Sequence, residues 1–142
     1  MSLKVVSNID LNGFIEGSNY FSWHEFLYLH DWDMYVFPTI EQHKNILTFV
    51  KQIEQVRNFL NIQMIVTSML RPREYNRQID GSRFSKHIDG RALDFICDDL
   101  DFNKNKLKSK LDEFNIRMED HSGKWIHIDN ALPGPSGRFF KP

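Results

Sequence analysis

Apolar residues recur at steps of three and four positions along residues 39–60, with polar residues between them. This spacing places the apolar side chains on one face of an α-helix, so we predict that residues 39–60 form the main amphipathic helix. The recurring positions are Ile46, Val50, Ile53, Val56 and Leu60. The same spacing, with lysines on the polar side, predicts a second helix over residues 101–115. Its apolar positions are Leu107, Leu111 and Phe114.

Shorter runs have the composition or the alternation of β-strands. Residues 63–68 are apolar and β-branched and stop before Pro72, which disfavours continued regular structure. Residues 92–97 alternate between apolar and other side chains and predict a second strand. Residues 116–129 predict a hairpin. Its strands are residues 116–119 and 124–129, and its turn is residues 120–123.

The chain is expected to form one domain over residues 1–142, in three parts. Residues 1–38 are rich in aromatic side chains, and Ser22 followed by Glu25 is the signature of a short capped helix. Residues 39–130 hold the predicted core elements. Residues 131–142 contain Pro and Gly and are predicted to be a tail with little regular structure.

The predicted fold class is α+β, with helices covering one face of a small, mainly antiparallel sheet. Side chains alternate between the two faces of a strand, so Asp94 is expected to point away from the core, toward an open face. The same alternation in the hairpin turns His127 to that face. His87 lies in a polar loop over residues 71–91, which is interrupted by a helical turn near residues 74–78. The three side chains can therefore meet.

Two imidazoles and one carboxylate supply three ligands of a tetrahedral zinc centre and leave the fourth position for water. For Asp94 alone a hydrogen-bonded structural carboxylate is the simpler interpretation, and for His127 alone an ordinary surface histidine. The combination with His87 favours the metal. An open fourth position indicates catalysis. The other histidines of the N-terminal half are predicted to be structural: His24, His30 and His43.

Composition excludes several classes of partner. The 18 basic and 19 acidic residues leave a formal charge of −1, which gives no electrostatic reason to expect nucleic acid or an anionic membrane surface. The single Cys97 excludes an internal disulfide and is predicted to be a small core residue. No run approaches the roughly 18 apolar residues of a membrane span, and residues 1–10 lack the apolar stretch of a secretory signal.

Three blocks, in this order along the chain, resemble the M15 peptidase group, which includes zinc D-alanyl-D-alanine carboxypeptidases and phage endolysins with a hedgehog-like zinc peptidase fold. The blocks are Ser68-Met69-Leu70-Arg71-Pro72-Arg73-Glu74-Tyr75-Asn76, then Ser85-x-His87-x-x-Gly90-x-Ala92-x-Asp94, and then Trp125-Ile126-His127-Ile128-Asp129. The resemblance implies that His87, Asp94 and His127 bind Zn²⁺. It also implies that Arg71 holds a substrate carbonyl or carboxylate and stabilises the developing oxyanion. Ser85 would contact the substrate or brace the ligand loop.

The chain departs from the family pattern at one position. Several relatives carry an acidic residue three positions before the last histidine ligand, where it deprotonates the attacking water, but this chain has Lys124. Glu119 or Asp120 could take that role from the hairpin turn. Asp129 could support His127 from the same face of the strand. Alternatively the metal alone ionises the water, or hydrolysis has been lost.

We therefore expect a zinc-dependent peptidase that hydrolyses peptide bonds in the stem peptides of bacterial peptidoglycan. It would be a D-Ala-D-Ala carboxypeptidase or an L-Ala-D-Glu endopeptidase. We expect a monomer without a signal peptide, made in the cytoplasm and acting on the cell wall after release or as part of a virion, as a phage-encoded lysin does. The alternative is a non-catalytic zinc-containing module that binds cell wall or builds a virion, and Lys124 favours it. A metal-free α+β binding protein is the third interpretation.

Overall fold

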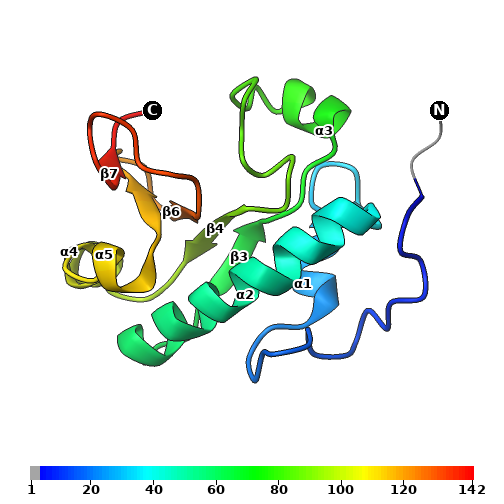
Figure 1. Ribbon diagram of the computed structural model, residues 1–142, viewed down its shortest axis with the longest axis horizontal. Helices are drawn as coiled ribbons and strands as arrows, with labels where there is room; N and C mark the ends of the chain where they lie inside the picture. Colours follow the sequence, from blue (N-terminus) through cyan, green and yellow to red (C-terminus); the bar gives the residue numbers. More distant parts are fainter. Residues whose placement is uncertain (1–3) are drawn as a thin grey trace.

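The computed structural model describes residues 4–142 and has the predicted α+β architecture (Figure 1). Its main sheet has five strands in the order β3-β4-β6-β5-β7. All neighbouring pairs are antiparallel except β5 and β7, which are parallel. The strands are β3 (Ile65–Ser68), β4 (Ala92–Ile96), β5 (Arg117–Glu119), β6 (Ile126–Asp129) and β7 (Phe139–Phe140).

The long helix α2 (Ile40–Leu60) confirms the prediction of a main amphipathic helix and crosses one face of the sheet (Figure 1). Thr39 caps it by accepting a hydrogen bond from the backbone N–H of Gln42, whose side chain bonds back to Thr39. Its buried stripe packs against the inward side chains of the strands in one apolar core. This core includes Ile46, Phe49, Val50, Ile53 and Val56 of the helix and Leu93, Phe95, Ile126 and Ile128 of the sheet.

The prediction of one continuous helix over residues 101–115 is wrong. The structure has α4 (Leu100–Lys108) and a separate short α5 (Leu111–Phe114). Ser109 lies at the break, where its hydroxyl donates to the carbonyl oxygen of Lys106 at 2.7 Å. A serine that bonds to the local backbone in this way competes with helix continuation. The apolar face survives the break, because Leu107 and Leu111 are both buried.

Residues 131–142 have little regular structure, as predicted, apart from one short strand that the sequence did not indicate. Residues 139–140 form β7 beside β5, and the backbone N–H groups of Met118 and Asp120 donate to the carbonyl oxygens of Arg138 and Phe140. Without β7, β5 would expose an unpaired edge. A strand of two residues has too little periodicity to be found from the sequence.

The N-terminal part holds the capped helix α1 (Trp23–Leu27), as predicted, and a small unpredicted hairpin of β1 (Tyr28–Leu29) and β2 (Met34–Tyr35). The polar loop contains α3 (Arg73–Gln78), close to the predicted helical turn. Cys97 packs against the core but is only half-buried. Within residues 4–142, every helix is too short or too polar to span a bilayer.

Candidate metal centre

Strand pairing brings two of the three predicted ligands together. Asp94 of β4 lies directly opposite His127 of β6, and Ser68 of β3 lies on the other side of Asp94. Side chains directly opposite one another in an antiparallel pair share a face of the sheet. The Asp94 Oδ1 to His127 Nδ1 distance is accordingly 2.8 Å. This face is the one away from α2, as the alternation of the sequence predicts.

His87 reaches the same point from the loop before β4. Its Nε2 lies 3.2 Å from Asp94 Oδ1, and one ligand atom from each of the three side chains lies within 4.8 Å of the others. The Nδ1 N–H of His87 donates to the carbonyl oxygen of Met69 at 2.7 Å, which fixes the ring and directs Nε2 to the centre. His87 is buried, with 2% of its surface exposed.

Helix α2 anchors the loop that carries His87. Gln42 Nε2 donates to the carbonyl oxygen of Ile88, and Asn45 Nδ2 donates to that of Asp89. Gly90 has φ +72°, and a Cβ there would meet Ile46 Cγ1 at 3.0 Å. Glycine therefore provides both the left-handed backbone and the close approach to the helix. This is the structural reason for the glycine between His87 and Asp94.

Asp129 holds the other nitrogen of His127. His127 Nε2 donates to Asp129 Oδ2 at 3.0 Å, so Nδ1 is the nitrogen that faces Asp94. Asp129 is 1% exposed and pairs with Arg117 through two hydrogen bonds of 2.8 and 2.9 Å. The guanidinium of Arg117 lies 3.9 Å from the ring centroid of Phe140. A relay of β5, β6 and β7 side chains therefore sets the orientation of His127.

The pKa values of the two histidines are shifted in opposite directions. Burial lowers the pKa of His87 despite the attraction of Asp94. Burial also opposes protonation of His127, but its hydrogen bonds to Asp129 and Asp94 outweigh this and raise its pKa to about 9. Burial raises the pKa of Asp94, but its contacts with both histidines more than compensate and hold that pKa well below its usual range. The carboxylate is therefore ionised at neutral pH.

The residues present fit a metal ion. His87 Nε2 is buried and forms no hydrogen bond within residues 4–142, although it lies 3.2 Å from Asp94 Oδ1, because the geometry of that contact is not that of a hydrogen bond. A buried imidazole nitrogen normally has a hydrogen-bond partner. In each ring, the nitrogen that faces away from the centre donates a hydrogen bond, from His87 to a backbone carbonyl and from His127 to a carboxylate. Metal-binding histidines commonly have this arrangement. Two imidazoles and one carboxylate are a donor set that suits Zn²⁺.

The comparison with protein families agrees with this geometry. The model of the family described as Peptidase M15 matches residues 20–129. The chain belongs to the Peptidase M15 family. The matched residues include β4, β6 and the loop before β4, which together carry His87, Asp94 and His127. Neither the search of curated proteins nor the search of solved structures found a match.

Membership in the M15 family implies peptidase activity and indicates a metallopeptidase that acts on peptidoglycan. M15 peptidases are typically zinc-dependent, and His87, Asp94 and His127 form a group that could hold such an ion. The family that the three ordered sequence blocks predicted is thus confirmed. The structure adds where the other predicted residues lie.

Arg71 lies beside this group and braces Asp94, one of the three predicted ligands. Its Nη2 donates to Asp94 Oδ2 at 3.0 Å, its Nε to Ser68 Oγ at 2.8 Å, and its Nη1 to Asn76 Oδ1 at 3.3 Å. Ser85 lies at the start of the ligand turn, where its Oγ accepts from the backbone N–H of His87 at 3.2 Å. Arg71 and Ser85 both line the cavity in front of the ligand group, so each remains within reach of a bound substrate.

The structure separates the two carboxylates proposed as bases. Glu119 lines the cavity with its Oε2 3.9 Å from His127 Nδ1. Asp120 is not among the residues that line this cavity, and it pairs with Lys141, with Oδ2 3.3 Å from Nζ. Lys124 is exposed in an adjoining groove. His121 lies in the turn, where its ring packs against Trp125.

The cavity has a volume of about 570 Å³, and part of its wall comes from the unpredicted strand β7. Phe140 and Lys141 line it, and the ring centroids of Phe140 and His127 are 6.0 Å apart. Neither residue could be predicted to lie here from the sequence. The role of Arg117 was not predicted either, although the predicted hairpin offered a signal. Arg117 lies opposite Asp129 across β5 and β6, and the two side chains are oppositely charged.

Proposed function

We propose that this M15 family chain is a zinc-dependent peptidase of bacterial peptidoglycan stem peptides, with His87, Asp94 and His127 as the metal ligands. The observation that carries the proposal is the convergence of His87 Nε2, Asp94 Oδ1 and His127 Nδ1 in a buried group, with a second partner fixing each imidazole. Zinc held there would polarise the scissile carbonyl and lower the pKa of a water molecule.

Glu119 is the residue that we propose as the general base. Its carboxylate lines the cavity beside His127, whereas that of Asp120 is engaged by Lys141 outside this group. A base must come within hydrogen-bonding reach of the proton that it removes, and geometry therefore favours Glu119. A carboxylate on β5 can thus replace the acidic residue that the family often carries at the position of Lys124.

We propose that Arg71 acts both on Asp94 and on the substrate. Three of its five N–H groups bond to Ser68, Asn76 and Asp94, and the remaining two are available at the cavity wall. A carbonyl oxygen that gains negative charge during hydrolysis would accept from these donors. Ser85 would brace the ligand turn through the N–H of His87.

The shape of the site favours cleavage within a peptide. A second groove of about 500 Å³ continues on the other side of Arg71 and Asp94, and both of these residues and Trp125 border both spaces. The group of proposed ligands therefore lies between the cavity and the groove, and each of these spaces could bind a segment of the substrate. A carboxypeptidase needs a site that closes after the terminal residue. We therefore propose endopeptidase action over carboxypeptidase action.

The alternative function is a zinc-containing module that binds cell wall without cleaving it. The observation that favours it is Lys124, because a cation at that position cannot accept a proton from water at neutral pH. The position of Glu119 favours the enzyme. The two functions differ in whether bound wall peptides acquire new termini.

The test uses purified, zinc-loaded protein and purified bacterial cell walls. We expect new amino termini inside the stem peptides, without release of free D-alanine. Glu119→Gln should retain zinc and lose about 10²- to 10⁴-fold in activity, the range expected for a lost general base. Asp120→Asn is the matched control and should keep near wild-type activity. Zinc-loaded wild-type protein that sediments with walls and creates no new termini would establish the binding module instead.

A further inference from the structure

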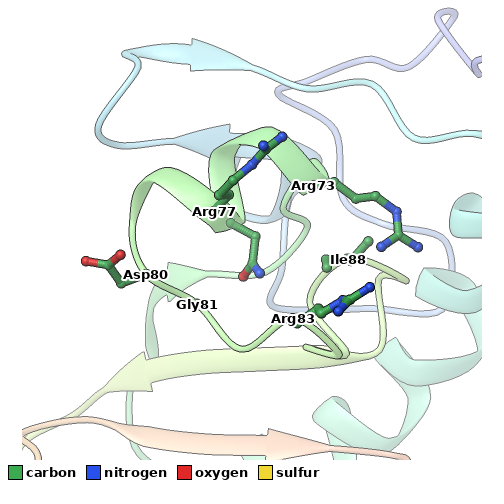
Figure 2. Close-up of a pocket in the computed structure, with 7 residues that line it drawn as sticks. Arg73, Arg77, Asp80, Gly81, Arg83 and Ile88 are labelled. Carbon is green, nitrogen blue, oxygen red and sulfur yellow. The ribbon is translucent and has the colours of Figure 1, made fainter.

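A cavity of about 590 Å³, separate from the two spaces described above, lies beside the candidate metal centre and is lined by three arginines (Figure 2). Arg73 and Arg77 come from α3, and Arg83 comes from the loop that follows. The side chains of Arg73 and Arg83 extend to the same side of the cavity, near Ile88, whereas Asp80 points away from them (Figure 2). Asp80 is the acidic residue among the lining side chains.

The three arginines differ in their ion pairs. Arg77 pairs with Glu74. Arg73 and Arg83 form no ion pair within the described residues 4–142. Two unneutralised guanidinium groups on one concave surface create a local positive potential, although the whole chain carries a formal charge of only −1. The net charge of the sequence does not reveal this local cluster of positive charge.

The arginine-lined cavity adjoins the proposed catalytic cavity. Asp80 and Gly81 border both spaces. Asn76 fixes the loop between them, because its Nδ2 donates to the carbonyl oxygen of Ser82 at 2.8 Å while its Oδ1 accepts from Arg71. A Cβ at Gly81 would meet Asn76 Oδ1 at 2.0 Å, so the loop packs directly on this buried amide. The geometry thus connects the arginine-lined cavity to Arg71 and the metal ligands.

We infer that the arginine-lined cavity is a subsite for a carboxylate of the substrate peptide, held by Arg73 and Arg83. This inference rests on the proposed function, because the shared loop makes the two cavities one continuous surface for a peptide. Guanidinium groups bind carboxylates through paired N–H donors, and stem peptides carry free carboxylates along their length. The subsite would favour acidic stem peptides over their amidated forms.

The experiment measures binding by calorimetry on the zinc-loaded Glu119→Gln protein, which should hold peptide without cleaving it. The probes are L-Ala-γ-D-Glu-L-Lys with a free glutamyl α-carboxylate and the same peptide with that carboxylate amidated. Combining Arg73→Gln with Arg83→Gln should weaken binding of the acidic peptide by about threefold to tenfold, as expected for two partly exposed charge pairs. Binding of the amidated peptide should not change. Arg77→Gln is the matched control and should affect neither peptide.

Three results would overturn the inference: equal loss for both peptides, no loss for either, or no measurable binding of the acidic peptide by the parent protein. A glycerol phosphate oligomer tests the other source of anions in cell walls. If it binds through Arg73 and Arg83 more tightly than the acidic peptide, the subsite recognises phosphodiesters and the inference is wrong. Wall cleavage by the wild type with arginine-independent binding rejects the subsite alone. Arginine-dependent binding without wall cleavage rejects the proposed hydrolysis and retains the subsite.

Discussion

At the scale of single residues, the partners of the two histidines determine which nitrogen of each ring faces the proposed metal position. Met69 engages Nδ1 of His87 and leaves Nε2, whereas Asp129 engages Nε2 of His127 and leaves Nδ1. The alternation of β6 places Asp129 on the same face as His127, which the sequence indicates. The carbonyl of Met69 could not be assigned this role from sequence, because every residue carries the same backbone acceptor.

Replacing Asp129 tests its control of the metal centre. Asp129→Asn should lower zinc affinity by about 10- to 100-fold, the usual cost of losing a carboxylate that orients a ligating histidine. Competition with a chromogenic chelator measures the affinity, and Asp120→Asn is the control at a half-buried carboxylate of the same hairpin. If Asp129→Asn lowers the Tm but leaves zinc affinity unchanged, Asp129 supports the fold through Arg117 and does not tune the metal.

Replacing Arg71 tests its two contributions. Arg71→Lys removes a planar group that bonds simultaneously to Ser68, Asn76 and Asp94, and an ammonium group cannot match that geometry. We expect a lower kcat/KM on a cleavable wall peptide together with a smaller decrease in zinc affinity. Steady-state kinetics at saturating zinc separates the two effects. An unchanged kcat/KM under these conditions would remove Arg71 from the reaction.

At the scale of elements, the sequence predicted what periodicity can encode. The apolar stripe of α2 and the alternation of β4 were sufficient to predict both elements, and the residues that these elements turn toward the core are buried. The break at Ser109 was missed because Leu107 and Leu111 keep helical spacing across it. Strand β7 was missed because its two residues carry no pattern and its pairing with β5 depends on a contact distant in sequence.

The two residues of β7 should have different effects when truncated. Phe140 contacts Arg117 and approaches His127, whereas Phe139 packs against the apolar core. We expect Phe140→Ala to lower kcat/KM and zinc affinity because the Arg117–Asp129 pair loses its cover. Phe139→Ala is the matched control and should lower the Tm with little effect on either quantity. Equal effects of both variants on zinc affinity would show that β7 acts only through overall stability.

At the scale of the whole molecule, the proposed ligands join three separate parts of the chain. His87 lies in the loop held by α2, Asp94 lies in β4, and His127 lies in β6. The ordered motifs predicted this convergence. They did not predict that Gln42 and Asn45 of α2 would hold the ligand loop, because polar side chains on a helix carry no signal of their partners. A bound ion would therefore stabilise contacts across the whole domain.

Zinc should raise the Tm, and the increase should become larger as the pH rises. An ion that binds only the folded state at about 100 times its Kd stabilises it by about 2.7 kcal/mol, which corresponds to roughly 8 °C for a domain of this size. The pKa of His127 is about 9 in the metal-free fold, above its ordinary value of 6.5. Protonation of His127 therefore stabilises the metal-free protein fully below pH 6.5, and that stabilisation disappears as the pH rises through about 9.

Zinc responds in the opposite direction, because it must displace the proton from His127 Nδ1 and binds more tightly as the pH rises. The Tm difference between zinc-loaded and chelator-treated protein should therefore increase between about pH 6 and about pH 8. Differential scanning calorimetry at matched ionic strength measures it, with His127→Ala as the variant that should show no zinc-dependent shift. A shift that decreases over this pH range, or one that persists in His127→Ala, would mean that zinc binds elsewhere on the molecule.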